Sequence, residues 1–221
     1  MSGKTVLRNW CLAFVATVIM VGVCIAYVDR PAAEFFDLHL RPTTAWAWIA
    51  RALAPLYLTF AMALLFVLGC VIWASSGRLL PLWTRTPRLC SWAAVGAAVA
   101  SFVFKRIFGR ARPDPEYVHN HLYGFHLLHS APHWHSFPSG TDMISVAIVS
   151  VLWILQPRWR TPGILIAALL CVAVVLTNYH WVGDVVAGTF LGAFIGWMTV
   201  RVSMAGDRAS LPEIWKNSLP S

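Results

Sequence analysis

Long, nearly uncharged segments constrain this chain more than any other feature of its sequence. Six stretches come close to the roughly 20 apolar residues that cross about 30 Å of hydrocarbon. They run over residues 9–28, 55–74, 89–107, 139–156, 161–179 and 182–200. Because a backbone in lipid must satisfy its own hydrogen bonds, such spans fold as helices. The sequence therefore predicts an all-α polytopic membrane protein with six transmembrane helices.

The composition agrees with a membrane location. Of the 221 residues, 58% are hydrophobic and only 12% are charged, whereas about a quarter of the residues of soluble domains are charged. The net charge of +8 is better explained by cations that flank membrane spans than by a nucleic-acid partner. All five cysteines fall in apolar segments, so neither a disulfide framework nor a metal-binding cysteine pair is predicted.

The segment after the first span, residues 31–55, is mixed in polarity and contains Trp46 and Trp48. This pattern is typical of a short helix that lies in the membrane interface. The first span is longer than the apolar region of a signal peptide, and we expect it to remain as an uncleaved helix. The chain is thus predicted to be one membrane domain over 1–221, with a tail over about 203–221.

The distribution of cations predicts the orientation. Ten of the 17 Lys and Arg residues flank the side that carries both termini, and seven flank the other side. The positive-inside tendency then places the termini and the tail in the cytoplasm. Four of the other seven lie in the stretch KRIFGRARP, at Lys105, Arg106, Arg110 and Arg112. Since the positive-inside tendency disfavours cations on the outer side, this cluster indicates a function.

Two short patterns suggest an anion site. Lys105 and Arg112 are seven residues apart, so a continuing helix would place them on one face, although cations at a helix end also suit lipid headgroups. In the stretch FPSGTD, Ser139 and Gly140 precede an apolar run. The free N–H groups of a helix start favour an anion, although an ordinary serine cap explains this pattern equally well.

A third pattern suggests a nucleophile. His180 and Asp184 are four residues apart, so on a helix the carboxylate can hold one imidazole nitrogen and leave the other free to attack. Gly188, Gly192 and Gly196 continue the same spacing, and small residues let another helix approach closely. We expect this stripe to face the interior of the bundle. The alternatives are a His–Asp pair that only locks two helices, and a glycine stripe that serves a homodimer.

Together, the three patterns resemble the type 2 phosphatidic acid phosphatase superfamily of integral membrane lipid phosphatases. The family motif Lys-x6-Arg-Pro is matched from Lys105 to Pro113, and Pro-Ser-Gly-His appears as Pro-Ser-Gly-Thr, ending at Thr141. The third motif keeps His180 and Asp184. The resemblance covers a phosphatase-like core of about residues 50–200, in motif order, spacing and helix layout.

The resemblance implies how a phosphate is held. Lys105 and Arg112 would bind the phosphate oxygens, and Ser139 and the Gly140 amide would add donors at the helix start. These cations would supply the charge stabilisation that Mg²⁺ often gives. No metal and no other cofactor is therefore expected.

The resemblance also implies a catalytic mechanism. His180 would attack phosphorus and form a phosphohistidine, which water hydrolyses, and Asp184 would orient the histidine. The substrate would be a membrane lipid phosphate on the outer face of the cell inner (plasma) membrane. Transfer of the phosphoryl group to another acceptor, or lipid-phosphate binding without catalysis, are the alternative functions.

Two positions depart from the family pattern. Thr141 stands where the family has the histidine that protonates the leaving group, and Val174 stands where it has an arginine. Three residues could replace the missing phosphate donor: Arg106, Arg110 and Asn178. Residues 119–136 hold six of the eight histidines, and His133 or His135 could replace the acid.

The threonine favours one class of substrate. A hydroxyl is too weak an acid to donate a proton at neutral pH, so Thr141 itself is a poor substitute. A monoester expels a basic alkoxide and needs a proton, whereas a diphosphate expels a phosphate, which leaves with little help. We therefore expect a lipid diphosphate, such as a polyprenyl diphosphate, to be the preferred substrate.

Overall fold

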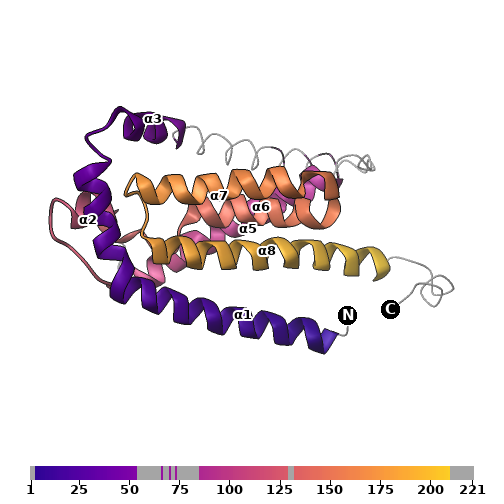
Figure 1. Ribbon diagram of the computed structural model, residues 1–221. Coiled ribbons are helices and arrows are strands. Elements are labelled where there is room, and N and C mark those ends of the chain that lie inside the picture. The colour runs from indigo at the N-terminus through magenta and orange to yellow at the C-terminus, as the bar shows by residue number, and fades with distance from the viewer. Residues whose placement is uncertain are drawn as a thin grey trace.

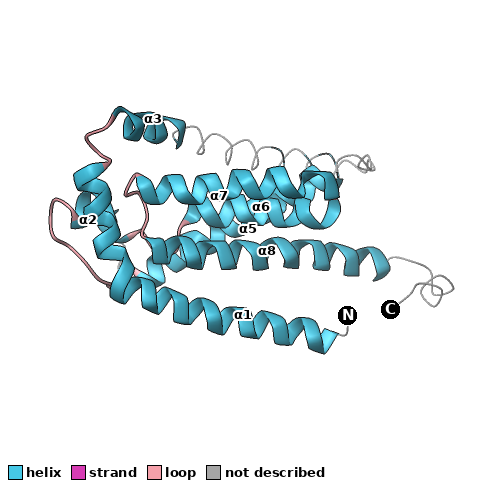
Figure 2. Ribbon diagram, in the orientation of Figure 1, coloured by secondary structure: helices cyan, strands magenta, loops and turns pink. Residues whose placement is uncertain are grey.

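The computed structural model describes residues 3–53, 85–128 and 132–209, together with the single positions 66, 70 and 73. Within these ranges the elements are helices, and no strand occurs among them (Figure 2). The all-α prediction is therefore confirmed for the described chain. The predicted span 55–74 lies outside the described residues apart from the three single positions, so the count of six transmembrane helices stays a prediction.

Four helical segments of the described chain are long and apolar enough to cross a membrane. They are Lys4–His39, Arg85–Phe108, Pro157–Leu176 and Val182–Ala205. Helix α6 (Gly140–Leu155) is apolar but has only 16 residues, which gives it a length of about 24 Å. The predicted span over 139–156 is thus a helix that is shorter than a full crossing.

The N-terminal part forms one bent helical rod. Helix α1 (Gly3–Val23) continues through the π-helical turn η1 (Cys24–Val28) into α2 (Asp29–His39), where the rod bends (Figure 1). A π-helical turn inside a helix frequently marks a functional site. Asp29, the first residue after this turn, is buried at 1% exposure.

The interfacial segment differs from the prediction of a single helix over 31–55. It contains the end of α2 and a separate helix α3 (Thr44–Leu53). The break falls at Pro42, which lacks an N–H group and restricts the residue before it. Both helices lie at one end of the bundle, away from the start of α1 (Figure 1).

The core is built on α6, which contacts α5 (Arg85–Phe108), α7 (Arg160–Leu176) and α8 (Val182–Ala209). Small and medium-sized apolar side chains fill the space between α5, α6 and α8. The buried members of this cluster are Leu89, Ala93, Ala97, Met143, Ala147, Val151 and Val200.

The glycine stripe of α8 lies directly on the backbone of α6. A Cβ atom at Gly188 would lie 2.7 Å from the Ser139 carbonyl oxygen, and one at Gly192 would lie 2.5 Å from that of Met143. Any larger side chain at these positions would push the two helices apart. The predicted inward orientation of the stripe is confirmed. Because α6 of the same chain covers it, these glycines pack internally and not between two copies.

The two ends of the bundle carry different parts of the chain. The start of α1 and the last turns of α8 lie together at one end, and α2 and the turn between α7 and α8 lie at the other (Figure 1). The KRIFGRARP stretch follows α5 at this second end. The motifs therefore gather at the end opposite the start of α1, as the predicted topology requires.

Candidate active site

Backbone hydrogen bonds draw the three sequence motifs to one place. The Ser139 N–H group donates to the Asp184 carbonyl at 3.1 Å, which joins the start of α6 to the first turn of α8. The Ser136 N–H group donates to the Arg110 carbonyl at 3.0 Å, which joins the same segment to the chain after α5. Segments that are far apart in sequence therefore share one end of the bundle.

His180 does not lie on the same helix as Asp184, contrary to the prediction. Helix α7 ends at Leu176, and α8 begins only at Val182, so His180 lies in the connecting turn. The four-residue spacing nevertheless brings His180 Nδ1 within 3.6 Å of Asp184 Oδ2. This distance is longer than a hydrogen bond, and within the described chain Nδ1 has no hydrogen-bond partner.

The carboxylate of Asp184 is held by other donors, which explains the long distance. Its Oδ1 accepts a hydrogen bond from Arg110 Nη1 at 2.6 Å. Its Oδ2 accepts from the Ser136 hydroxyl at 2.5 Å and from the Trp181 N–H group at 3.3 Å. Asp184 is thus fixed independently of His180, with one oxygen turned toward the imidazole.

Burial keeps the His180 imidazole neutral. Its side chain is only 2% exposed. Burial lowers the pKa of His180 to about 4, Asp184 raises it in part, and the charges of Lys105 and Arg112 lower it. A neutral imidazole has a free lone pair and can act as a nucleophile at physiological pH. The same pKa effect locates both cations near His180.

Lys105 points toward the start of α6. A Cβ atom at Gly140 would lie 3.7 Å from Lys105 Nζ and 2.7 Å from the Ser101 hydroxyl oxygen. A side chain at position 140 would therefore collide with α5. Ser139 is the N-cap of α6, and its buried hydroxyl oxygen accepts from the Asp142 N–H group at 3.5 Å. The ammonium group and the N-terminal turn of α6 thus lie side by side.

Arg112 reaches the site from a loop and not from a continuing helix. Helix α5 ends at Phe108, and Gly109 has a positive φ of 49°, which is common directly after a helix. The Arg112 guanidinium lies 5.4 Å from the centre of the Tyr179 ring, next to His180 in sequence. Its Nε atom is buried and has no hydrogen-bond partner in the described part of the chain.

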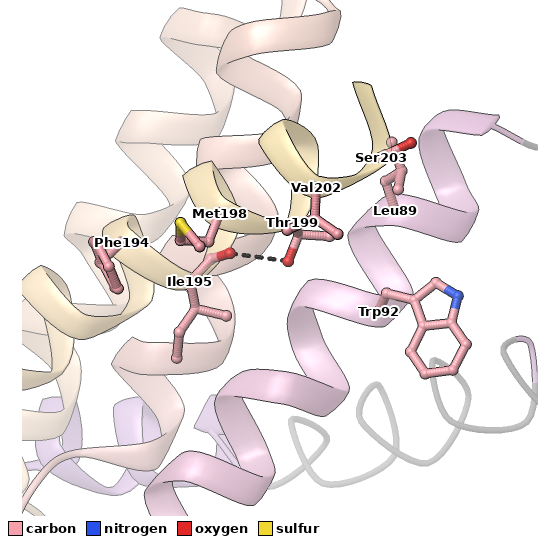
Figure 3. A pocket seen from close by; sticks show the side chains of 8 residues that line it. All are labelled: Leu89, Trp92, Phe194, Ile195, Met198, Thr199, Val202 and Ser203. Carbon is pink, nitrogen blue, oxygen red and sulfur yellow. Dashed lines mark hydrogen bonds between the residues drawn. The ribbon is translucent and has the colours of Figure 1, made fainter. Parts of the chain in front are cut away.

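One mostly apolar pocket of the described chain lies elsewhere. It has a volume of about 600 Å³ and opens between α5 and α8, at the end away from the motifs (Figure 3). Its lining is mostly apolar and contains no ionisable side chain of the candidate site. The lining residues are Leu89, Trp92, Phe194, Ile195, Met198, Thr199, Val202 and Ser203.

Comparison with known families agrees with this arrangement. The model of the PAP2 superfamily matches residues 88–207, which include all three motifs. The chain belongs to the PAP2 superfamily. It is accordingly a phosphatase and a multi-pass membrane protein, and the predicted resemblance is confirmed.

Characterised relatives act on lipid phosphates. The chain is 27% identical over 149 residues to an undecaprenyl-diphosphatase of Sulfolobus acidocaldarius, a match that covers 66% of this chain and 70% of the relative. It is 34% identical over 116 residues to a lipid A 1-phosphatase of Rhizobium johnstonii, covering 50% of this chain and 45% of the relative. The chain therefore spans less than half of the length of the second relative.

A solved structure has the same fold. A PAP2-type phosphatidylglycerolphosphate phosphatase from Bacillus subtilis superposes with a TM-score of 0.58 at 18% identity. The match covers 89% of this chain and 96% of the other. The described helices thus follow a known PAP2 transmembrane fold.

The three predicted substitutes for the missing PAP2 arginine lie in different surroundings. Arg110 is fully buried, and its Nη1 and Nη2 atoms donate to Asp184 and Asp29, so both end groups already have carboxylate partners. Asn178 uses its Nδ2 atom to donate to the Ala33 carbonyl at 2.9 Å. The geometry therefore gives Arg110 and Asn178 partners within the chain.

Arg106 differs from the other two because it is exposed on α5. Its guanidinium lies 4.3 Å from the centre of the Phe102 ring. Val174, at the position of the missing arginine, is buried at 1% exposure. Its carbonyl accepts hydrogen bonds from the N–H groups of Tyr179 and His180 at 2.9 and 3.1 Å. Position 174 thus supports, through its backbone, the turn between α7 and α8 that contains His180 (the histidine turn).

The two candidate acids, His133 and His135, differ in their exposure and in their partners. His133 is 63% exposed, and its Nδ1 atom lies 3.3 Å from Glu116 Oε1. The Nε2 atom of His135 is buried and has no hydrogen-bond partner among the described residues. The backbone of His135 lies beside that of Arg110. His135, and not His133, therefore has a buried ring nitrogen next to the chain that follows α5.

The charges around His135 confirm its position. Burial lowers the pKa of His135, and the charges of Lys105, Arg112 and Arg106 lower it further. Three cations from KRIFGRARP are thus close enough to act on this imidazole. Thr141, in the first turn of α6, is partly buried. Among the described residues no group of three or more metal-ligating side chains is close enough to hold a metal ion.

Sequence reasoning missed Asp29 and Ser136 entirely. A signal for Asp29 was available, because an acid at the end of an apolar span is by default a functional candidate. Ser136 had no such signal, since a serine in a loop is ordinary. Both were found only through their contacts with Arg110 and Asp184.

Proposed function

We propose that this PAP2 phosphatase hydrolyses a lipid phosphate or diphosphate through a phosphohistidine at His180. The observation that supports this most is the buried, neutral imidazole of His180, which lies beside Asp184 and close enough to Lys105 and Arg112 for their charges to act on it. A nucleophile, an orienting carboxylate and a phosphate-attracting charge are thereby combined at one point.

In the first chemical step, the lone pair of His180 Nε2 attacks phosphorus. Nδ1 faces Asp184, so it carries the proton, and Nε2 is the free nucleophile. The bond from phosphorus to the leaving oxygen breaks, and that oxygen takes the electron pair. The imidazole becomes positively charged, and the carboxylate of Asp184 stabilises this charge.

The phosphoryl oxygens become more negative as this bond breaks. Lys105, Arg112 and the N–H groups of the first turn of α6 would stabilise that charge without any movement of the chain. In the second step water attacks phosphorus, the P–N bond breaks, and its electrons return to Nε2. Inorganic phosphate leaves, and His180 is again neutral.

The leaving group decides the substrate. We propose a lipid diphosphate, with a polyprenyl diphosphate favoured, because Thr141 offers no proton to a basic alkoxide. The named activity of the relative from Sulfolobus acidocaldarius is consistent with this choice. His135 is the group best placed to assist monoesters. The negative charge of a bound phosphate would offset the cations that lower the pKa of His135, and so help it to carry a proton.

The decisive experiment measures phosphate release by the purified protein in detergent. We expect release from a polyprenyl diphosphate by the wild type, and loss of about 10⁴-fold or more in His180→Ala, because the covalent route is removed. His39→Ala, a change of an exposed histidine in α2, is the matched control. Unchanged release by His180→Ala would exclude the phosphohistidine. Consumption of substrate without release would instead indicate transfer to another acceptor.

We also propose that the site faces the outside of the inner membrane and that both termini are cytoplasmic. Single cysteines can test this in intact cells with a reagent that does not cross the membrane. His119→Cys, near the motifs, should be labelled from outside, and Arg158→Cys, at the other end of the bundle, should not. The reverse pattern would invert the proposed topology.

A further inference from the structure

A buried charge cluster connects the first helical rod to the histidine turn. Arg110 Nη2 donates to Asp29 Oδ2 at 2.5 Å, and Arg110 Nη1 donates to Asp184 Oδ1 at 2.6 Å. All three side chains have 0% exposure. Asp29 is therefore the second carboxylate on the guanidinium that holds Asp184.

Asp29 also contacts the backbone directly before Asp184. Its Oδ1 atom accepts a hydrogen bond from the Gly183 N–H group at 3.0 Å. A Cβ atom at Gly183 would lie 3.2 Å from Asp29 Oδ2 and 3.5 Å from Arg110 Nη1. Only a glycine leaves this space free. The start of α8 is thus positioned by a carboxylate that comes from the other end of the sequence.

The charges of the cluster determine what Asp184 can do. Two carboxylates and one guanidinium leave a net charge of −1 in a site that excludes water, where charges interact strongly. If Arg110 faced Asp184 alone, the pair would be neutral and Asp184 would offer little negative charge to His180. Because Asp29 shares the guanidinium, negative charge remains beside the imidazole.

We propose that Asp29 is a positioning residue of the catalytic machinery. Through Arg110 and Gly183 it sets the place and the charge of Asp184, so that Asp184 can balance the positive charge that His180 acquires in the phosphohistidine. This inference rests on the proposed function. It assigns a role to a residue outside residues 88–207, the part that matches the PAP2 model, and outside the predicted core of about 50–200.

Asp29→Asn tests the proposal, because it keeps the size of the side chain and removes its charge. Arg110 would then neutralise Asp184, and the step that forms the phosphohistidine would slow. We expect kcat to fall about 10- to 100-fold, the range typical of groups that orient a directly acting residue, with KM changed by less than about twofold. Asp37→Asn, an acid on the same helix that is partly exposed and paired with Arg41, is the control and should keep the wild-type kcat.

A second variant separates charge from packing. Asp29→Asn combined with Arg110→Gln removes both members of one buried pair and leaves Asp184 with its negative charge, held by the neutral donors Ser136 and the Trp181 N–H group. We expect its kcat to exceed that of Asp29→Asn alone. A purely structural role predicts the opposite order, because the double variant loses more contacts. Both kcat values are referred to the amount of folded protein in each sample, so that a difference in stability does not set the order.

The rate of phosphohistidine formation is the direct readout, measured by alkaline quench in single-turnover experiments. A folded Asp29→Asn protein with the wild-type rate would overturn the inference, as would a double variant slower than the single one. The proposed function fails separately, namely if His180→Ala retains activity. An inactive His180→Ala beside a fully active Asp29→Asn would reject only the role of Asp29.

Discussion

The candidate site has two charged sides that differ in how their charges are balanced. On the carboxylate side, Arg110 is buried between Asp29 and Asp184. On the cation side, Lys105 and Arg112 form no ion pair with a carboxylate of the described chain. The cations of both sides come from one short stretch of sequence, KRIFGRARP. We expect that the cation with its counter-charge in the protein fixes the fold, whereas the two without it attract an anion from outside.

The difference matters because the same residue type performs both tasks. Arg110 and Arg112 are two residues apart, and both are arginines at the end of the bundle opposite the start of α1. One completes a buried cluster with 0% exposure, and the other stacks near Tyr179 with a buried Nε that has no partner in the described part. Under the proposed function, the partners of each arginine, and not its residue type, distinguish a role in the fold from a role in substrate binding.

The largest expected effect comes from a change on the carboxylate side, at Arg110. Arg110→Met leaves two buried carboxylates without a counter-charge, and removal of one partner of a buried pair costs about 3–5 kcal/mol. We expect a strongly lowered melting temperature in detergent and little folded protein. A melting temperature equal to that of the wild type would show that the cluster does not hold the fold.

The matched change on the cation side is Arg112→Met. This variant should keep the melting temperature of the wild type, because Arg112 has no carboxylate partner among the described residues. We expect kcat/KM for phosphate release to fall about 10²- to 10³-fold, as for removal of one preorganised donor to a developing anion. Loss of stability with retained activity would reverse the assignment of the two sides.

His135 gives a smaller, substrate-dependent effect. His135→Asn should lower turnover of phosphatidic acid by about 10²-fold, the lower range for general acid catalysis, and turnover of a polyprenyl diphosphate much less. Equal losses on both substrates would argue against a proton-donating role. His133→Asn, which changes the exposed neighbour paired with Glu116, should change neither.

The same histidine predicts a pH dependence. In the free protein burial, and then the neighbouring cations, hold the pKa of His135 below its ordinary value, and His135 donates only when protonated. For the monoester, kcat/KM should therefore fall as the pH rises through that lowered pKa. It should also fall at low pH near 4, where His180 gains a proton and loses its lone pair. His135→Asn should remove the decline at higher pH and leave the decline near pH 4.

The smallest expected effect is that of Thr141→His. A histidine at this position would restore the family acid and raise the turnover of phosphatidic acid severalfold, less than the about 10²-fold of a well-placed general acid. The preference for a diphosphate should narrow accordingly. If phosphatidic acid is already the faster substrate of the wild type, the leaving-group argument is wrong.

Much of the fold could be predicted because apolar length and glycine spacing are local signals. The helices over 9–28, 89–107 and 161–179 were predictable from hydrophobic runs alone. The inward orientation of Gly188 and Gly192 followed from their four-residue spacing, whereas the contact with α6 is seen only in the structure. The helix break before α3 was missed, although Pro42 provided a signal for it.

The site was only partly predictable because its polar contacts are not local. Arg110 and Asp29 are 81 residues apart, and no spacing rule connects them. The choice between His133 and His135 also depends on the tertiary structure, because it depends on which ring faces the cations. His180 was expected on a helix, but α8 begins two residues later. The carboxylate of Asp184, which was expected to hold His180, has other partners.

The pairing of Asp29 has a consequence for how the protein is made. During synthesis Asp29 enters the membrane with the first helix, 81 residues ahead of Arg110 and 154 ahead of Gly183. Its partners Arg110 and Gly183 are made later, and Arg110 can bridge Asp29 and Asp184 only after the start of the last described helix has been synthesised. The cluster around Asp184 is therefore among the last parts of the described chain that can be completed.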